Sequence, residues 1–518
     1  MFIQPETADW LRYRSYATPT KTALLFGEER WTFAELDILT DQLCGWLSQW
    51  DLPKNRRVGV LMHNSLEYVL LIYAAARLNL TLVTFNSRLT SAEVEWQIGF
   101  TQCGVVLVDE ANSEKVHSAQ KLSIGNWQLT TTCPWGIDNF DRNPSINSNN
   151  ATQSIVFTSG TTGRPKAVPI RFEQHFYSAM ASAYRLGVEH DDVWLSVLPL
   201  YHVGGMAVIF RSLLYGTAVD LHQRFDLEQI NHALDNKPIS MISVVPTMLY
   251  RLTETRQTWP DSMRLILVGG AAASPELVEA AGKLSRDGKP LVATSYGLTE
   301  VASQFATQTP TDTLKKPGSV GRPFLFNELR IVRDENDNGQ HTAGNGERKT
   351  DRSTDPLIGE IQIRGPVLMA GYLDNPAVNS ERFSADGWFA TGDLGYLDAD
   401  GDLYVVQRRS DLIISGGENV YPAEVEAALR EHPAVKEACV IGLPDAEWGQ
   451  IVAAMVEFLP EQQLTSGELI GFSQQTLARY KQPRFIELVA QLPQTASGKI
   501  ERKQVESLLK EKFSLDNK

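Results

Sequence analysis

A short apolar segment at residues 155–157 predicts a buried strand, and it runs directly into small polar residues. The residues that follow are Thr158, Ser159, Gly160, Thr161, Thr162 and Gly163, and then Lys166. Glycines bring backbone N–H groups close to a ligand, hydroxyls add donors, and a lysine supplies positive charge. The segment therefore has the chemistry of a loop that binds polyphosphate. It lacks the ending and spacing of a Walker A loop.

Three later segments carry side chains suited to a metal-bound nucleotide. Residues 295–300 bring the ring of Tyr296, the hydroxyl of Thr299 and the carboxylate of Glu300 into one turn. Asp393 ends a Trp-Phe-Ala-Thr-Gly-Asp segment, and one ionised carboxylate serves a vicinal diol well. Lys499 lies in a loop near the C-terminus, where an isolated lysine is usually a solvated charge.

Composition limits the function classes that need to be considered. The chain has 518 residues, of which 43% are hydrophobic and 21% charged, which favours a protein of about two to four domains. The longest apolar stretch, at 68–76, is too short to span a membrane, and the N-terminus does not resemble a signal peptide. The net charge of −14 argues against nucleic-acid binding, so an anionic substrate needs local positive charge. The four cysteines have no metal-ligand spacing, which indicates free thiols in a reducing cytoplasm.

Helices and short apolar strands alternate between residues 31 and 108, and again after residue 154. Thr32 and Glu35 form a predicted capping box, and Ser274 and Pro275 begin another helix. Such alternation predicts parallel sheets covered by helices, so the fold class is α/β. The predicted strands lie at 58–62, 81–83, 193–197, 241–245 and 265–268.

The pattern changes after about residue 318. Short strands at 328–332, 360–364 and 403–406 predict a smaller β-rich subdomain. Residues 333–356 are polar and highly charged, and we interpret them as a mobile surface insertion. Residues 411–518 predict a separate small domain of helices and strands.

In their order and spacing, these segments resemble the motifs of the adenylate-forming superfamily, which includes acyl- and aryl-CoA ligases, luciferases and peptide-synthetase adenylation domains. The resemblance extends over nearly the whole chain. It implies a large N-terminal domain of layered αβαβα sheets with a β-rich subdomain, followed by a small mobile C-terminal α+β domain. The expected boundaries are 1–407 for the N-terminal domain, 408–411 for a hinge and 412–518 for a lid.

The resemblance also implies roles for single residues toward ATP and Mg²⁺. Tyr296 would stack on adenine, Thr299 would bond the α-phosphate and Glu300 would hold Mg²⁺. Asp393 would accept from both ribose hydroxyls, with Arg408 as a second contact, although Gln407 stands where the family usually has glycine. Further residues expected at the nucleotide are Gly270, Ala271 and Ala272.

The implied reaction has two steps. A carboxylate attacks the α-phosphate of ATP, with Lys499 bridging the two anions, and pyrophosphate leaves. The acyl-adenylate is a mixed anhydride that the thiol of CoA then attacks. Between the steps the small domain would swing about Asp411, withdrawing Lys499 and presenting a turn at Gly416 and Gly417 to the pantetheine arm.

The segments at 198–216, 268–275 and 295–304 most resemble the o-succinylbenzoate–CoA ligases of menaquinone and phylloquinone synthesis. That acid has an aromatic ring and two carboxylates, so its pocket needs an apolar slot and a cation. His202 would contact the acyl group. Arg211 either binds the second carboxylate or is a helix-surface charge, and Ser303 and Gln304 either donate to the substrate or cap a following helix.

Other functions share these motifs. The chain could be another aryl- or medium-chain acyl-CoA ligase, or a free-standing adenylation enzyme that loads a carrier protein. Nothing in the sequence specifically supports the oxygen chemistry of a luciferase. A degenerate nucleotide sensor would be expected to lose one of Lys166, Glu300, Asp393 and Lys499, which are all present. The partners expected are small molecules, with a homodimer implied by the resemblance alone.

Overall fold

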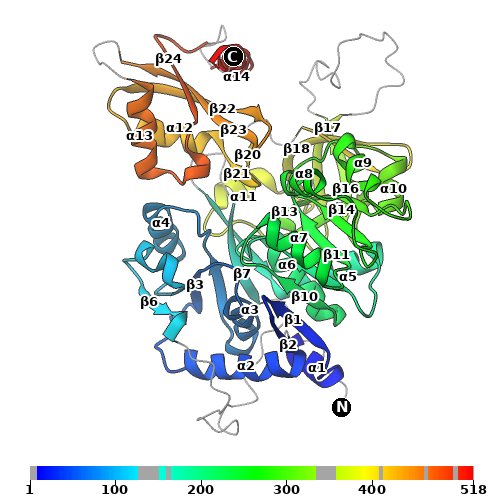
Figure 1. Cartoon of the computed structure of the whole chain (residues 1–518). Helices are drawn as coiled ribbons and strands as arrows, with labels where there is room; N and C mark the ends of the chain where they lie inside the picture. Colours follow the sequence, from blue (N-terminus) through cyan, green and yellow to red (C-terminus); the bar gives the residue numbers. More distant parts are fainter. Residues whose placement is uncertain are drawn as a thin grey trace. The chain divides into compact units, whose positions relative to one another are not determined.

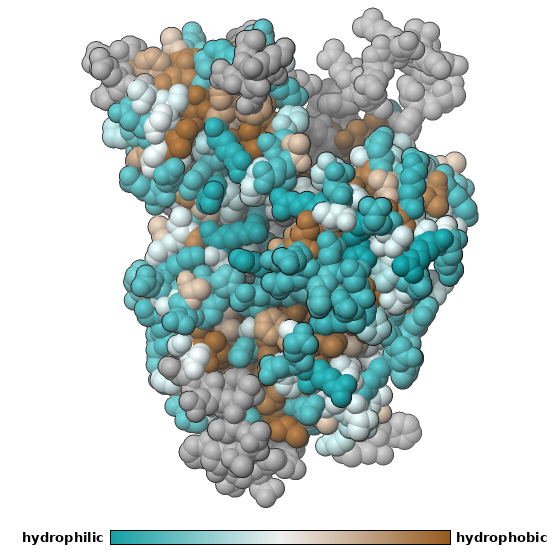
Figure 2. Space-filling view, in the orientation of Figure 1, coloured by the Kyte–Doolittle hydropathy of each residue, from teal (hydrophilic) through white to brown (hydrophobic). Residues whose placement is uncertain are grey.

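The computed structural model describes residues 9–126, 151–158, 165–333, 358–407, 412–459, 465–493 and 500–516. The chain forms two compact units, and each is described separately (Figure 1). The larger unit consists of Met1–Ser87, Ile98–Val156 and Ala167–Gln407; the smaller one consists of Arg88–Gln97, Phe157–Lys166 and Arg408–Lys518. None of the described helices has the length and apolar character needed to cross a membrane. Figure 2 shows a face on which hydrophilic residues predominate and hydrophobic ones form separate patches.

A nine-stranded sheet is the largest element of the first unit, and its central strands are parallel. In spatial order, the strands are β15 (Arg322–Pro323), β14 (Ser303–Thr307), β13 (Val292–Leu298), β12 (Leu265–Val268), β11 (Met241–Val244), β9 (Val193–Ser196), β10 (Ala218–Leu221), β1 (Thr22–Phe26) and β2 (Glu29–Thr32). The helices between them are α5 (Phe172–Leu186), α6 (Val203–Tyr215), α7 (Leu227–Asn236), α8 (Pro246–Thr255) and α9 (Pro275–Lys283).

Side chains of each central strand point alternately to the two faces of this sheet, as the strand geometry requires. In β9, Trp194 joins a core that includes Phe172 of α5 and Phe210 of α6. Its neighbour Leu195 joins a different core, together with Ile230 of α7. Both faces are therefore covered by helices, as is usual for a parallel sheet.

A second, six-stranded sheet has helices of its own. Its strands, in spatial order, are β6 (Gln120–Ser123), β5 (Val105–Val108), β3 (Arg57–Leu61), β4 (Thr81–Thr84), β7 (Thr152–Thr158) and β8 (Lys166–Arg171). Along the chain, α2 (Phe33–Leu47) precedes β3, α3 (Leu66–Leu78) connects β3 to β4, and α4 (Ser91–Thr101) connects β4 to β5. The pairings of β3 with β4 and β5, of β4 with β7, and of β5 with β6 are parallel.

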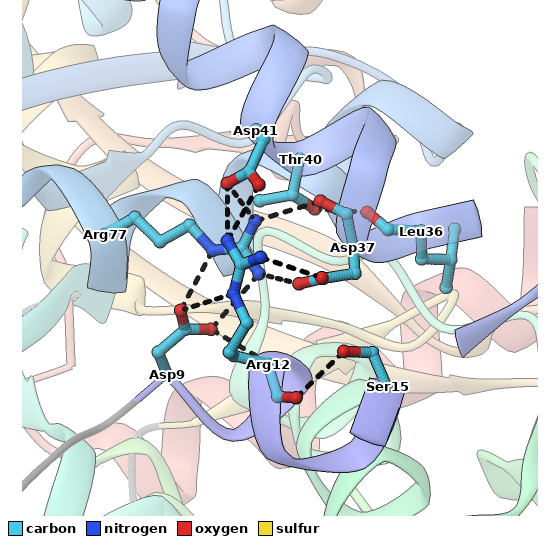
Figure 3. A network of polar contacts seen from close by, with 8 residues as sticks. All are labelled: Asp9, Arg12, Ser15, Leu36, Asp37, Thr40, Asp41 and Arg77. Carbon is cyan, nitrogen blue, oxygen red and sulfur yellow. Dashed lines mark hydrogen bonds and ion pairs between the residues drawn. The ribbon is translucent and has the colours of Figure 1, made fainter. Parts of the chain in front are cut away.

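A network of five charged residues fixes the first helix, α1 (Trp10–Ala17), to α2 and α3 (Figure 3). Arg77 of α3 is buried and donates to Asp9 at 3.0 Å, to Asp41 at 2.7 Å and to Asp37. Arg12 donates to Asp37 at 3.0 Å and to Asp41 at 2.7 Å. Burial alone would lower the pKa of Arg77, but the three carboxylates raise it, so the network keeps its buried cation charged.

The β-rich part of the first unit is an antiparallel sheet of β16 (Glu328–Val332), β17 (Gly359–Arg364), β18 (Phe389–Leu397) and β19 (Leu403–Gln407). Two short helices accompany it, α10 (Pro310–Lys315) and α11 (Pro376–Arg382). Lys316, at the end of α10, donates to three aspartates of the β18–β19 turn: Asp398 at 2.8 Å, Asp400 at 2.7 Å and Asp402 at 2.5 Å. These hydrogen bonds raise the pKa of Lys316.

The C-terminal part of the smaller unit, as described between residues 412 and 516, contains a five-stranded sheet and three α-helices. The strands are β21 (Glu418–Val420), β20 (Ile413–Ser415), β23 (Gly449–Phe458), β22 (Val435–Asp445) and β24 (Phe485–Val489). The helices are α12 (Pro422–Arg430), α13 (Ser466–Thr476) and α14 (Arg502–Asp516).

The predicted α/β class is confirmed, with parallel sheets followed by a β-rich region. The capping box is also confirmed, because the Thr32 hydroxyl accepts from the backbone N–H of Glu35 and the Glu35 carboxylate accepts from that of Thr32. Ser274 caps α9 as expected. The insertion predicted at 333–356 lies outside the described residues except for Arg333.

Candidate active site

The predicted phosphate loop is described only at its two ends. Thr158 closes β7 and the buried Lys166 opens β8, and the Thr158 hydroxyl donates to the Lys166 carbonyl at 3.5 Å. The two ends of the loop thus lie close together. The expected phosphate ligands between them, residues 159–163, lie outside the described residues.

The structure brings together two residues that the sequence analysis assigned to one nucleotide. Tyr296 lies in β13 and Asp393 in β18, and both are buried. The Tyr296 phenol donates to an Asp393 carboxylate oxygen at 2.7 Å. Thr391 supports this arrangement, because its hydroxyl accepts from the Asp393 backbone N–H at 3.1 Å and donates to the Ile361 carbonyl at 2.7 Å.

Thr299 and Glu300 lie in a single 3₁₀ turn, Thr299–Val301, that directly follows β13. The Glu300 carboxylate is buried and accepts from the Tyr372 phenol at 2.6 Å. The Glu300 carbonyl accepts from the Met369 backbone N–H at 2.8 Å, which fixes the turn. A positioned carboxylate is the type of oxygen ligand that Mg²⁺ prefers, so Glu300 fits a metal-binding role.

The backbone around this turn requires unusual conformations. A side chain at Gly297 would meet the Ser303 carbonyl oxygen at 1.8 Å, so only glycine fits there. Ala302 and Ser303 have φ values of 53° and 120°, which non-glycine residues rarely adopt. Strained backbone is often found at functional sites.

One of the two interpretations of Ser303 and Gln304 is wrong, because they cap no helix. Both belong to strand β14, which pairs antiparallel with β13. Gln304 is buried, accepts from the Ser182 hydroxyl at 3.2 Å and donates to Thr307 at 2.9 Å.

The predicted nucleotide residues Gly270, Ala271 and Ala272 follow the buried strand β12 and precede the capped start of α9. Gly270 has a φ of +80°, which lets the chain turn sharply at the strand's end. The Ser295 hydroxyl donates to the Val268 carbonyl at 3.2 Å and ties β13 to this turn. The loop is therefore held at the carboxyl end of the parallel strands, where α/β folds usually bind ligands.

His202 is the N-cap residue of α6, and the loop before it is firmly attached to neighbouring elements. The Asn64 side chain accepts from the Leu200 backbone N–H at 2.8 Å and donates to the Leu198 carbonyl at 3.0 Å. A side chain at Gly205 would meet the Pro199 carbonyl oxygen at 2.3 Å, so the helix start packs against this loop through glycine.

Arg211 is a buried residue of α6, so it is no helix-surface charge. Only 2% of it is exposed, and burial lowers its pKa to about 10. One of its terminal nitrogens donates to Ser178 at 3.2 Å, and the guanidinium carbon lies 6.0 Å from the Trp194 ring centre. Within the described part of the chain, its Nε has no hydrogen-bond partner and no carboxylate forms an ion pair with it.

Three buried polar residues of α5, the helix that carries the Arg211 partner Ser178, were missed by the sequence analysis. His175, Ser178 and Ser182 are all 2% exposed and lie on the buried face of α5. Their spacing of three and four residues was visible in the sequence and places them on one helix face. Polar side chains at such spacing are ordinarily attributed to an exposed face, and nothing local reveals that this face is buried.

In the smaller unit, Gly416 and Gly417 form the two-residue turn between β20 and β21. Both have positive φ values, 59° and 84°, as a tight hairpin of this kind requires. A side chain at Gly416 would also meet the Trp448 ring at 2.7 Å. Arg408, Asp411 and Lys499 lie outside the described residues.

Comparison with known proteins extends over both units. The family described as AMP-binding enzyme matches residues 11–373, and the AMP-binding enzyme C-terminal domain matches residues 424–499. A 2-succinylbenzoate–CoA ligase from Bacillus pumilus is 37% identical over 507 residues, which are 98% of each chain.

Solved structures give the same result. The chain superimposes with a TM-score of 0.86 on a double mutant of o-succinylbenzoate CoA synthetase from Bacillus subtilis bound with its product analogue, at 36% identity and covering 97% of this chain and 99% of that one. For that synthetase in complex with its acyl-adenylate intermediate, the TM-score is 0.69, with the same identity and coverage. The protein therefore belongs to the AMP-binding enzyme family.

Proposed function

We propose that the protein is an ATP-dependent, AMP-forming ligase that joins o-succinylbenzoate to CoA in menaquinone or phylloquinone biosynthesis. The aliphatic carboxylate of the substrate attacks the α-phosphate of ATP, and pyrophosphate leaves. The CoA thiolate then attacks the carbonyl carbon of the acyl-adenylate and AMP leaves. The products are o-succinylbenzoyl-CoA, AMP and pyrophosphate.

The observation that carries the choice of acid is the burial of Arg211. A buried guanidinium that has one hydroxyl partner and no carboxylate among the described residues is costly, because burying an unpaired charge loses its hydration. A ligand that brings its own carboxylate would remove this cost. The o-succinylbenzoate molecule carries a second carboxylate that is not activated. Benzoate or a fatty acid has only one carboxylate, and that one is activated.

The nucleotide half of the site follows from the residues described above. Tyr296 and Asp393 would hold the adenosine part of ATP, Thr299 would bond the α-phosphate, and Lys166 would take the leaving phosphates. Glu300 would hold Mg²⁺, which neutralises phosphate charge when bound. Because both reactants are anions, holding them in line is the main task of these residues.

For the second step, we propose an N-terminal domain at 1–407, a hinge at 408–411 with Asp411 as its pivot, and a lid at 412–518. In one arrangement the lid supplies Lys499 to the carboxylate and the α-phosphate. In the other it supplies the Gly416–Gly417 turn, which lets CoA enter. The glycine hairpin supports the latter role, because a turn without side chains lets a ligand approach its backbone closely.

The proposal is tested by measuring pyrophosphate release with ATP, Mg²⁺ and CoA. The panel is o-succinylbenzoate, benzoate, 4-hydroxybenzoate, cinnamate, octanoate and amino acids. We expect a strong preference for o-succinylbenzoate. Arg211→Met should reduce this preference about 100-fold, because the second carboxylate of the substrate would then be buried without a cation. Preference for another acid would overturn the substrate, and release without thioester formation would favour a carrier-protein acceptor.

We further propose a cytoplasmic location, a homodimer and small-molecule partners without nucleic acid. Free and buried cysteines at positions 44, 103 and 439 support a reducing compartment. The net charge of −14 disfavours nucleic acid. Sedimentation velocity would test the homodimer directly.

A further inference from the structure

The buried face of α5 is polar where it meets α6 and β14, although a helix face covered by other elements is usually apolar. His175, Ser178 and Ser182 follow one another along this face. Ser178 receives a hydrogen bond from Arg211 of α6, and Ser182 donates one to Gln304 of β14. Two of the three polar residues thus have hydrogen-bond partners across the interface, whereas His175 has none in the part of the chain that the structure describes.

His175 is buried with both ring nitrogens unpartnered among the described residues. Its ring stacks on Phe210, with ring centres 4.2 Å apart and planes at 27°. Burial and the neighbouring charge of Arg211 lower the pKa of His175 to about 3, so the ring is neutral at physiological pH. A neutral imidazole has one N–H donor and one acceptor nitrogen, and leaving both unmade inside a protein is unfavourable.

Two neighbouring buried groups, the His175 ring and the Arg211 guanidinium, therefore each have nitrogen atoms without a hydrogen-bond partner among the described residues. Phe210 and Arg211 are neighbours on α6, so the residue stacked on His175 directly precedes the guanidinium whose Nε is unpartnered. A carboxylate can accept several hydrogen bonds and could take one from each group. An apolar residue at position 175 would pack against Phe210 equally well, so packing alone does not account for a histidine.

We infer that His175 is a specificity-determining residue, whose neutral ring N–H donates to the non-reacting carboxylate of the substrate alongside Arg211. This inference rests on the proposed function and deepens it. Arg211 supplies the positive charge. His175 fixes the position of the carboxylate, because a hydrogen bond is strong only when the acceptor lies close to the line of the N–H bond. A substrate without that carboxylate would leave both donors unpaired, and such sites reject the incomplete analogue strongly.

The test compares two substrates that differ only in this group, o-succinylbenzoate and 4-oxo-4-phenylbutanoate, by their kcat/KM values. We expect His175→Phe to reduce kcat/KM for o-succinylbenzoate about 10- to 100-fold and to change that for the analogue less than about threefold. His175→Gln keeps a donor and should retain most of the wild-type preference. His175→Met is a second apolar variant, should His175→Phe not fold.

The outcomes separate the inference from the function on which it rests. If wild-type protein does not use o-succinylbenzoate, the proposed function fails before any variant is measured. If it does, but the apolar variants lose activity on both substrates equally, His175 has a structural role only and the inference is overturned. Equal loss in His175→Gln and His175→Phe would also overturn it, because hydrogen bonding would then not be the cause.

Discussion

The phenol of Tyr296 donates a 2.7 Å hydrogen bond to the carboxylate of Asp393, which lies 97 residues further along the chain. The bond joins β13 of the large sheet to β18 of the β-rich sheet. It orients the carboxylate and at the same time fixes the edge of the ring. The two residues are therefore expected to act on the nucleotide as a unit.

Replacing either member of this pair should weaken nucleotide binding. Asp393→Asn removes the charge that strengthens its hydrogen bonds, and we expect the Kd for ATP to rise about 100-fold. Tyr296→Phe keeps the ring and removes the bond to Asp393, and we expect a rise of about tenfold. Isothermal titration calorimetry measures both. Additive effects in the double variant would contradict the view that the pair acts as a unit.

Glu300 and its partner Tyr372 should control the dependence on Mg²⁺. Glu300→Gln keeps the shape but removes the charge, so we expect kcat/KM for MgATP to fall about 100-fold. Tyr372→Phe removes the hydrogen bond that orients the carboxylate and should lower kcat/KM about threefold to tenfold. Steady-state rates measured over a series of Mg²⁺ concentrations separate these effects. An unchanged Mg²⁺ requirement in Glu300→Gln would assign the metal to another ligand.

Lys499 should matter in only one of the two half-reactions. Its positive charge would neutralise the approach of carboxylate and α-phosphate, which is needed for adenylation and not for attack by a thiol. We expect Lys499→Ala to slow adenylation at least about 100-fold and to change thioester formation from supplied acyl-adenylate little. Rapid-quench measurements of each step provide the check. Equal losses in both would refute the assignment.

The charge network at Arg77 should contribute strongly to stability. Arg77→Met would leave Asp9, Asp37 and Asp41 without their buried cation, which we expect to destabilise the unit by about 3–5 kcal/mol. Arg12→Met is the matched control, because the Arg12 side chain is 35% exposed and its ion pairs should be worth less. Urea unfolding followed by tryptophan fluorescence compares the two. A similar loss in both variants would show that burial is not the deciding factor.

Stability should also fall in mild acid because of His175. Its pKa in the folded protein is about 3, below the usual value of about 6.5, so the unfolded chain binds more protons between these values. Its contribution is therefore complete above about pH 6.5 and is lost as the pH falls, by at most about 1.4 kcal/mol per pH unit. His175→Phe should unfold with a shallower dependence between pH 6.5 and 5. The two proteins should show parallel behaviour between pH 7.5 and 8.5.

Local features of this chain could be predicted well from the sequence. The Thr32–Glu35 capping box and the Ser274 cap depend on residues three apart, and β12 has the predicted bounds, 265–268. Features that depend on which segments pair with one another could not be predicted. Ser303 and Gln304 form part of strand β14 because they pair with β13, and no local sequence pattern indicates this pairing.

The residues proposed to bind the acyl group were also only partly predictable from the sequence. Arg211 was identified as a candidate, but its burial depends on α6 packing against α5 and β9, so the alternative of a surface charge stayed open. His175 was not identified, because an isolated histidine in an amphipathic helix has no distinguishing local signal. Tertiary packing decided both cases.

Lys316 occupies the position in the β18–β19 turn where a divalent ion could otherwise bind. The three carboxylates that it contacts lie close enough together to hold a divalent ion, but the ammonium already lies between them as a tethered counter-ion. We therefore expect the structure of this turn not to depend on the magnesium concentration, and chelators not to disturb it. A chelator that abolishes turnover should therefore leave the turn folded, so loss of activity and loss of structure can be told apart in a single titration.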